Sequence, residues 1–227
     1  MQQAEMLLQY YAAMHRHFGP SHWWPGETPF EVAVGAVLTQ NTAWRNVEKA
    51  MGLLRQANAL SPLVMHELSL PELEACLLPS GFYRMKAQRL RALLAFFARV
   101  AGQASPPNDP SLAFLRHLET ETLRPMLLEI NGIGPETADC ILLYALQRPV
   151  FVVDAYTRRM CSRHGVVPPK INYHELQAFF SDVLPQETAL FNEYHALIVR
   201  TGKEFCAKSK PRCKECPLGG FLERAVE

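Results

Sequence analysis

Two glycines one residue apart, set between two helical patterns, constrain this chain more than any other feature. They lie in segment 130–139, which reads Ile-Asn-Gly-Ile-Gly-Pro-Glu-Thr-Ala-Asp. Glycine adopts positive φ without steric cost, so Gly132 and Gly134 predict a tight turn with bare N–H groups. Pro135 suits the first turn of a new helix. The pattern predicts a helix, a hairpin and a second helix, a geometry that aims amides at a phosphate. A plain αα-hairpin is the other interpretation.

A single aspartate, Asp154, follows the apolar run 151–153 and precedes Ala-Tyr-Thr. A carboxylate at this point predicts an N-cap for the helix that begins there. The same carboxylate could also supply chemistry beside the hairpin, and the two roles are compatible.

The hairpin segment and the aspartate after it resemble the helix-hairpin-helix, Gly/Pro-rich and Asp signature of the endonuclease III superfamily of DNA glycosylases. Further segments resemble landmarks of that family in the same order: residues 29–42, residues 80–87 and the pattern Cys206-x6-Cys213-x2-Cys216. The resemblance therefore covers nearly the whole chain.

The resemblance implies an all-α fold with two lobes. A six-helix bundle with the hairpin, residues 28–148, is inserted into a discontinuous helical domain, residues 1–27 and 149–227, which carries the aspartate and the cysteine loop. Helical apolar spacing recurs along the chain, which agrees with this fold class. Residues 150–153 could form a strand, but it would have no partner. We expect DNA to bind across the cleft between the lobes.

Composition narrows the class of protein. Apolar residues make up 48% of the 227 residues, as in globular proteins, and no apolar run is long enough to span a membrane. No secretory signal pattern opens the chain, so we expect a cytoplasmic, nucleoid-associated monomer. The net charge is only +1, but basic residues cluster at 84–91 and 198–216. Such patches suit a face that binds the phosphates of double-stranded DNA containing damaged bases.

Asp154 is the catalytic residue that the resemblance implies. Cleavage of a base–sugar bond builds positive charge on the sugar, which a nearby carboxylate stabilises while it orients or deprotonates water. In the lyase branch of the superfamily a lysine stands at the position of Glu136. A carboxylate cannot act as an amine nucleophile, so we predict hydrolysis of the base without strand scission.

The tryptophans indicate a substrate class. Trp-Trp-Pro at 23–25 and an aromatic residue after Gln-Asn-Thr-Ala resemble the 3-methyladenine glycosylase branch. Flat rings suit a flipped-out base, and indole faces favour cationic alkylated purines by about 0.5–2 kcal/mol. Packing at the domain seam is the other role open to these rings. The base pocket that the resemblance implies comprises Trp23, Trp24, Pro25, Trp44, Glu136 and Lys203.

Two loop residues are expected to fill the duplex after a nucleotide is extruded. Gln40 matches the family's polar plug, and Phe82 matches its apolar wedge. The hairpin supplies the other DNA contacts, which the resemblance assigns to Gly132, Ile133, Gly134 and Thr137.

The cysteine loop departs from the family pattern. The family holds a [4Fe–4S] cluster with four thiolates. Here Cys206, Cys213 and Cys216 match the first three positions, and Leu222 stands at the fourth. A cluster with a non-cysteine or solvent ligand, a different metal, and a loop without metal all stay open. The conceivable fourth donors are Glu223, His164 and His195.

These features together predict a monofunctional DNA glycosylase of base excision repair that acts on alkylated purines. Glycosylases for mismatched or oxidised bases are the alternative within the enzyme class. A non-catalytic helix-hairpin-helix DNA-binding module is the alternative outside it.

Overall fold

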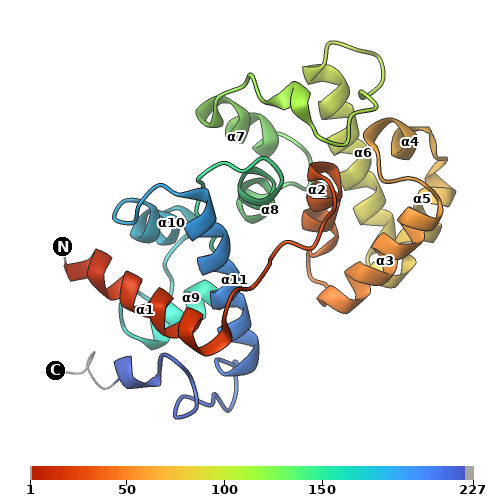
Figure 1. The fold of residues 1–227 in the computed structure, drawn as a ribbon. Coiled ribbons are helices and arrows are strands. Elements are labelled where there is room, and N and C mark those ends of the chain that lie inside the picture. Colours follow the sequence, from red (N-terminus) through yellow and green to blue (C-terminus); the bar gives the residue numbers. More distant parts are fainter. Residues whose placement is uncertain (1, 223–227) are drawn as a thin grey trace. The chain divides into compact units, whose positions relative to one another are not determined.

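The computed structural model describes residues 2–222, so Glu223 lies outside the described residues. The chain divides into two compact units, one formed by Trp24–Arg148 and the other by the residues up to Trp23 together with those from Pro149. Both units consist of helices and their connections, and no strand occurs among the described residues (Figure 1). The expected all-α fold class is confirmed.

The central unit, Trp24–Arg148, begins with a connection and then contains most of the helices. In chain order these are α2 (Pro29–Leu38), α3 (Trp44–Gln56), α4 (Pro62–Glu67), α5 (Leu70–Leu77), η1 (Leu78–Ser80), α6 (Tyr83–Val100), η2 (Ala113–Leu115), α7 (Thr120–Leu128), α8 (Pro135–Cys140) and η3 (Ile141–Ala145).

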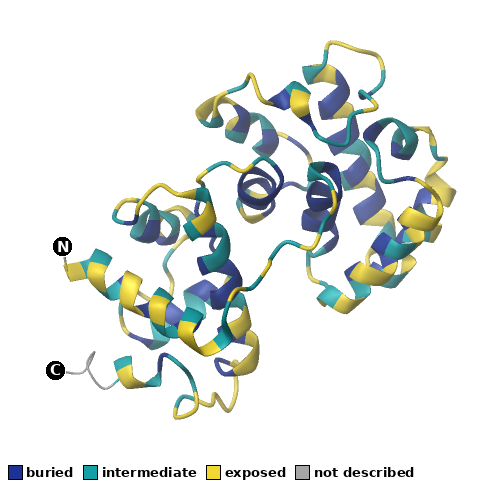
Figure 2. Ribbon diagram, viewed as in Figure 1, coloured by how far each residue is buried: buried dark blue, intermediate teal, exposed yellow. Residues whose placement is uncertain are grey.

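Helix α2 lies at the core of this unit. It contacts α3, α6, α8 and η3, and every residue from Phe30 to Leu38 is buried, as the dark colour of α2 in Figure 2 shows. The hydroxyl of Thr28 caps it by accepting a hydrogen bond from the backbone N–H of Glu31 at 3.2 Å. A helix that is apolar on nearly all sides is expected inside a core.

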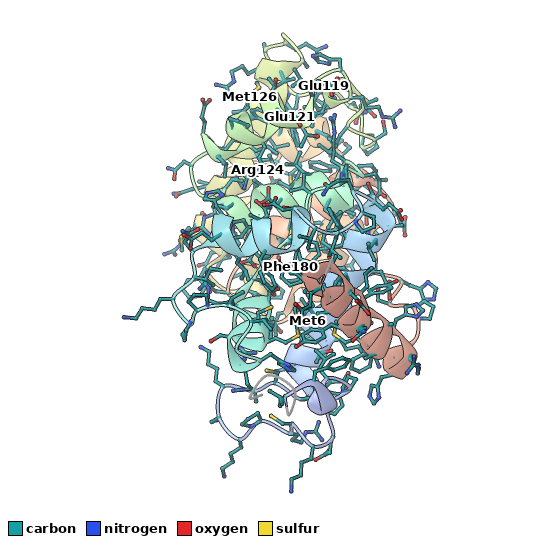
Figure 3. All side chains as sticks on the ribbon, turned by 90° about the vertical axis from the view of Figure 1, so that its left-hand side faces the viewer. Met6, Glu119, Glu121, Arg124, Met126 and Phe180 are labelled. Atoms are coloured by element: carbon teal, nitrogen blue, oxygen red, sulfur yellow. The ribbon has the colours of Figure 1, made fainter. Side chains whose placement is uncertain are left out.

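The second helix of the hairpin changes its winding part-way. Helix α8 ends at Cys140, and η3 continues as a π-helix in which the N–H of Leu146 donates to the carbonyl of Ile141 at 3.0 Å. Arg124, labelled in Figure 3, extends from α7 to the buried Asp139 of α8 and donates two hydrogen bonds to its carboxylate, at 2.7 and 3.0 Å. This bidentate ion pair fixes the two helices of the hairpin against each other.

The other unit contains α1 (Gln2–Phe18), α9 (Ala155–Arg163), α10 (Tyr173–Ser181), α11 (Thr188–Glu204) and η4 (Gly219–Phe221). Helix α11 contacts α1 and α9. The core of this unit is aromatic. Phe151 stacks on Phe180 with ring centroids 4.4 Å apart, and the hydroxyl of Tyr194 donates a hydrogen bond to the carbonyl of Leu7 at 2.7 Å. Residues 151–153 form a buried connection rather than a strand and lead directly to Asp154.

None of the helices within residues 2–222 combines the length and the apolar character needed to traverse a bilayer.

Candidate active site

The hairpin between α7 and α8 uses its two glycines differently. Gly132 has a φ of +86°, and a Cβ placed on it would lie 2.4 Å from Cγ of Arg89. Gly134 has a φ of −91° and caps α8 with extended backbone, and a Cβ on it would meet nothing within 4 Å. The expectation that both glycines need positive φ is therefore wrong for Gly134. The side chain of Ile133 is buried, so this residue can offer only its backbone to DNA.

The side chain of Gln40 is bound to this hairpin. Its Nε2 donates to the carbonyl of Gly132 at 3.1 Å and to Oγ1 of Thr137 at 2.8 Å. Its Oε1 accepts a hydrogen bond from Nη1 of Arg89, on α6. The predicted plug thus starts from a fully hydrogen-bonded position, and insertion into DNA would require these bonds to break.

A buried lysine connects the two loops that are predicted to enter the duplex. Lys86 of α6 is 1% exposed, and its Nζ donates to the carbonyls of Leu38 and Ser80, each at 2.8 Å, and to Oγ1 of Thr42 at 2.5 Å. Burial disfavours the ammonium, and the positive charge of Arg89 adds to this, so the pKa of Lys86 is lowered to about 8. Three hydrogen bonds satisfy its three donors. Sequence reasoning identified the 80–87 segment but assigned no role to this lysine.

Phe82 extends outward from the second of these loops. It has a φ of +46°, which is rare for a bulky residue, and it is 63% exposed. Leu78 and Met85, close to it in the chain, are also exposed. The loop therefore presents large apolar side chains to solvent, as a wedge requires.

An aromatic cavity of about 200 Å³ lies within the central unit. Trp24 and Trp44 line it with ring centroids 5.4 Å apart and nearly perpendicular planes, and Pro25 borders it. Tyr144 of η3 packs on Trp24 with centroids 5.3 Å apart. Gly35 of α2 makes room for Trp24, because a Cβ there would lie 3.0 Å from the indole nitrogen.

Charged residues that sequence reasoning missed also line this cavity. Glu31 is buried and forms an ion pair with Arg55 at 2.9 Å, and Glu48 borders the same space. Glu31 and Arg55 are far apart in the chain and no local pattern marks them as a pair.

Three of the six predicted pocket residues share this cavity, namely Trp24, Pro25 and Trp44. Glu136 is exposed in the first turn of α8 and does not line it. Trp23 and Lys203 belong to the other unit.

Asp154 caps α9 in the other unit. Its Oδ1 accepts hydrogen bonds from the backbone N–H of Thr157 at 2.7 Å and from the hydroxyl of Thr157 at 2.9 Å. The side chain is 9% exposed, and its Oδ2 lies 3.8 Å from Nε2 of His195. The N-cap role expected from the sequence is confirmed, and it occupies one carboxylate oxygen.

His195 is a buried residue of α11. Burial lowers the pKa of its imidazole despite the opposing effect of Asp154, and the charge of Lys203 lowers it further. The ring is therefore neutral at pH 7. Asp154, His195 and Lys203 form one electrostatic group, and only His195 had not been assigned to the active site from the sequence.

The three loop cysteines line a second, very small cavity of about 10 Å³. His164 and Leu222 line it as well, whereas His195 does not. The sulfur of Cys206 accepts a hydrogen bond from Arg163 at 2.9 Å, and burial raises the pKa of Cys216.

These residues supply three of the four thiolates of a [4Fe–4S] cluster, and an alkyl side chain occupies the fourth position. Among residues 2–222 no three His, Cys, Asp or Glu side chains are grouped as ligands of a metal ion. The loop therefore does not fit the family's four-thiolate cluster.

Comparison with known proteins identifies the family. Residues 34–186 match the model of a protein family, HhH-GPD, which is described as the HhH-GPD superfamily base excision DNA repair protein. The chain belongs to this family. A candidate DNA repair glycosylase of Methanocaldococcus jannaschii is 43% identical to this HhH-GPD protein over 217 residues, 96% of each chain.

Solved structures share the fold. The Helicobacter pylori 3-methyladenine DNA glycosylase, bound to 1,N6-ethenoadenine, is 28% identical and has a TM-score of 0.72, covering 89% of this chain and 97% of its own. A trapped endonuclease III–DNA covalent intermediate has a TM-score of 0.78 over 99% of both chains at 21% identity. This HhH-GPD protein is a DNA-binding enzyme, a DNA N-glycosylase of base excision repair.

Proposed function

We propose that the protein is a monofunctional glycosylase that hydrolyses the N-glycosidic bond of alkylated purines, such as 3-methyladenine, flipped out of double-stranded DNA. The observation that carries this proposal is the aromatic cavity shared by Trp24 and Trp44. The H. pylori relative, named a 3-methyladenine glycosylase and solved with ethenoadenine, supports the same substrate class.

The cavity has the chemistry that such a base needs. Perpendicular indole rings offer a π-face and a ring edge, and a cationic base is attracted to the face. The carboxylate of Glu48 at the border adds negative charge, whereas Glu31 is balanced by Arg55. Trp23, Glu136 and Lys203 do not line this cavity, and the family resemblance alone assigns them to base binding.

Asp154 acts on the sugar in this proposal. Its Oδ1 is held by the N-cap hydrogen bonds, so Oδ2 is the oxygen that stabilises the developing oxocarbenium charge and accepts a proton from the attacking water. The glycosidic electron pair leaves with the base, and an alkylated purine departs easily because it already carries positive charge.

The proposal excludes a lyase step. Glu136 stands where the lyase branch has its lysine, and a carboxylate forms no Schiff base with the sugar. Reaction of the protein with damaged DNA in the presence of borohydride should give no covalent adduct. An adduct would assign the protein to the lyase branch.

DNA binding is proposed for the 28–148 bundle acting as a monomer with the domain formed by 1–27 and 149–227. Gly132, Ile133, Gly134 and Thr137 bind a phosphate through the hairpin. Phe82 enters the duplex as the wedge, and Gln40 leaves its hairpin contacts to fill the vacated position.

For the cysteine loop we propose a [4Fe–4S] cluster held by Cys206, Cys213 and Cys216 with a fourth ligand that is not cysteine. The support is that all three thiols border one cavity. Anaerobic purification followed by iron analysis and visible absorption tests this, and protein free of iron contradicts it.

Release of free bases tests the proposed function directly. Duplexes that carry 3-methyladenine, 7-methylguanine, ethenoadenine, thymine glycol or a mismatch are incubated side by side with the protein. We expect release of the alkylated purines and loss of that release in Trp44→Ala with the fold preserved. Release of thymine glycol or of a mismatched base alone would favour an endonuclease III-like specificity.

A further inference from the structure

The aromatic cavity is a slot between one side of α2 and one side of α3. Glu31 and Gly35, four residues apart on α2, border it, as do residues of α3 from Trp44 to Arg55. The indole of Trp24 packs on Gly35 and so occupies the aromatic part of the slot. Glu31, in the first turn of α2, and Arg55, in the last turn of α3, form a charged part. The aromatic part suits the faces of a base, and the charged part suits its edge.

The two oxygens of the buried Glu31 carboxylate differ in their contacts. Oε2 accepts hydrogen bonds from Nη2 of Arg55 at 2.9 Å and from the backbone N–H of Glu27 at 3.4 Å. Among residues 2–222, no group donates a hydrogen bond to Oε1. The side chain is only 6% exposed, and an acceptor without a partner in such a place costs free energy. Oε1 is therefore a position for an N–H group of a ligand in the slot.

Arg55 supplies a donor beside this acceptor. One terminal nitrogen of Arg55 holds Glu31, and the planar guanidinium has five N–H donors in a fixed fork, so donors remain for a ligand. An acceptor and a donor side by side match adenine, which presents its amino group next to a ring nitrogen that accepts. Guanine presents O6 next to N7, which are two acceptors. Its O6 would face the carboxylate of Glu31.

The other walls of the slot discriminate little between the two purines. Pro25, Gly26 and Met51 offer no charged group to the edge of a base. Glu48 is exposed, so solvent screens its charge. The indole faces stack on either purine, because stacking tolerates any base. Discrimination at the edge of the base therefore depends on Glu31 and its partner Arg55.

We propose that Glu31 is a specificity-determining residue: its Oε1 accepts a hydrogen bond from the amino group of an alkylated adenine, Arg55 donates to the adjacent ring nitrogen, and alkylated guanines are disfavoured. This inference rests on the proposed function, because it takes the aromatic cavity as the pocket of the flipped-out base. A site built around such a hydrogen bond rejects a base that lacks the donor, since the carboxylate is left unpaired. For a hydrogen bond to a charged group, the expected preference is about 10- to 100-fold.

Release of two methylated bases from the same DNA tests this preference. Methylated duplex DNA contains 3-methyladenine and 3-methylguanine, which share the methyl position and the positive charge. Single-turnover rates of release are measured for the wild type, for Glu31→Gln and for Glu27→Gln. In Glu31→Gln the rate ratio of 3-methyladenine to 3-methylguanine should fall by about 10-fold or more, because a glutamine amide can also donate to O6. Comparison of ratios between proteins cancels the different intrinsic labilities of the two bases.

Glu27→Gln is the matched control, since Glu27 is exposed, does not line the cavity and loses the same charge. Its ratio should equal that of the wild type. A merely structural ion pair between Glu31 and Arg55 would slow the release of both bases by the same factor. A ratio in Glu31→Gln equal to the wild-type ratio therefore overturns the proposal, whatever the change in Tm.

Binding of the free bases tests the inference even if Glu31→Gln does not fold. Free 3-methyladenine and 3-methylguanine are titrated into the wild type, and quenching of tryptophan fluorescence gives each Kd. We expect 3-methyladenine to bind about 10- to 100-fold more tightly, and equal Kd values overturn the inference. Protein that binds with this preference but releases no base from DNA would support the inference about Glu31 and refute the proposed hydrolysis.

Discussion

The ammonium of Lys86 donates a hydrogen bond to the carbonyl of Ser80 although Phe82, between them in the chain, is 63% exposed. The same ammonium binds the carbonyl of Leu38, just before the loop that carries Gln40. One buried cation therefore determines the geometry of both loops that we expect to enter DNA.

Replacement of Lys86 by methionine should destabilise the protein by about 3 kcal/mol, because it leaves buried acceptors without a donor. Denaturant unfolding measures this. Arg84→Met is the matched control on the same helix, since the Arg84 side chain is 77% exposed and its loss should change the free energy of unfolding by less than about 0.5 kcal/mol. Equal effects of the two substitutions would contradict the role of Lys86.

The two glycines of the hairpin should respond oppositely to alanine. Gly132→Ala forces a side chain into positive φ and against Arg89, which should cost about 1–3 kcal/mol and displace Arg89 from Gln40. Gly134→Ala enters open space at an ordinary φ and should leave Tm nearly unchanged. Thermal unfolding gives the Tm of both variants. An equally low Tm in both would show that the free space and the φ at each glycine do not determine how the hairpin tolerates a side chain.

Two substitutions at Asp154 should separate the helix cap from the chemistry. Asp154→Asn keeps the acceptor for Thr157 and should retain stability, while base release falls by about 100-fold or more. Asp154→Ala loses both functions and should also cost about 1 kcal/mol of stability. Single-turnover release and Tm are measured together. Full activity in Asp154→Asn would remove this carboxylate from the mechanism.

Phe82→Ala should weaken activity on duplex DNA without weakening the fold. The side chain is mostly exposed, so its truncation removes the wedge and little packing. We expect base release from a duplex to decrease while Tm stays the same. Leu8→Ala, an exposed leucine of α1, is the control, and comparable losses in both variants would argue against a specific wedge.

Local sequence patterns predicted most helices well. Apolar spacing over residues 6–18, followed by Gly19 and Pro20, predicts a helix that ends at Phe18, where α1 ends. The amphipathic pattern of residues 85–102 predicts a helix that corresponds to α6. The short helix α4 was missed, although Ser61 and Pro62 form a typical helix start. Residues 150–153 stayed ambiguous because an apolar run does not distinguish a buried connection from a strand.

Charged pairs between residues far apart in the chain were less predictable. The pairs Arg124–Asp139, Glu31–Arg55 and Asp154–His195 depend on how helices meet, and no spacing along the chain encodes that. The different conformations and surroundings of Gly132 and Gly134 were missed for a related reason. A glycine pattern marks a turn, but it does not say which residue adopts positive φ and which one lies against a neighbour.

The π-helix that follows α8 absorbs one residue more than a regular helix of the same length does, through the wider loop closed by the hydrogen bond from Leu146 to Ile141. Deletion of a single residue from 141–143 would restore regular winding and leave Tyr144 on nearly the same side of the helix, against Trp24. Homologues shorter by one residue here are therefore expected to support that indole in the same way.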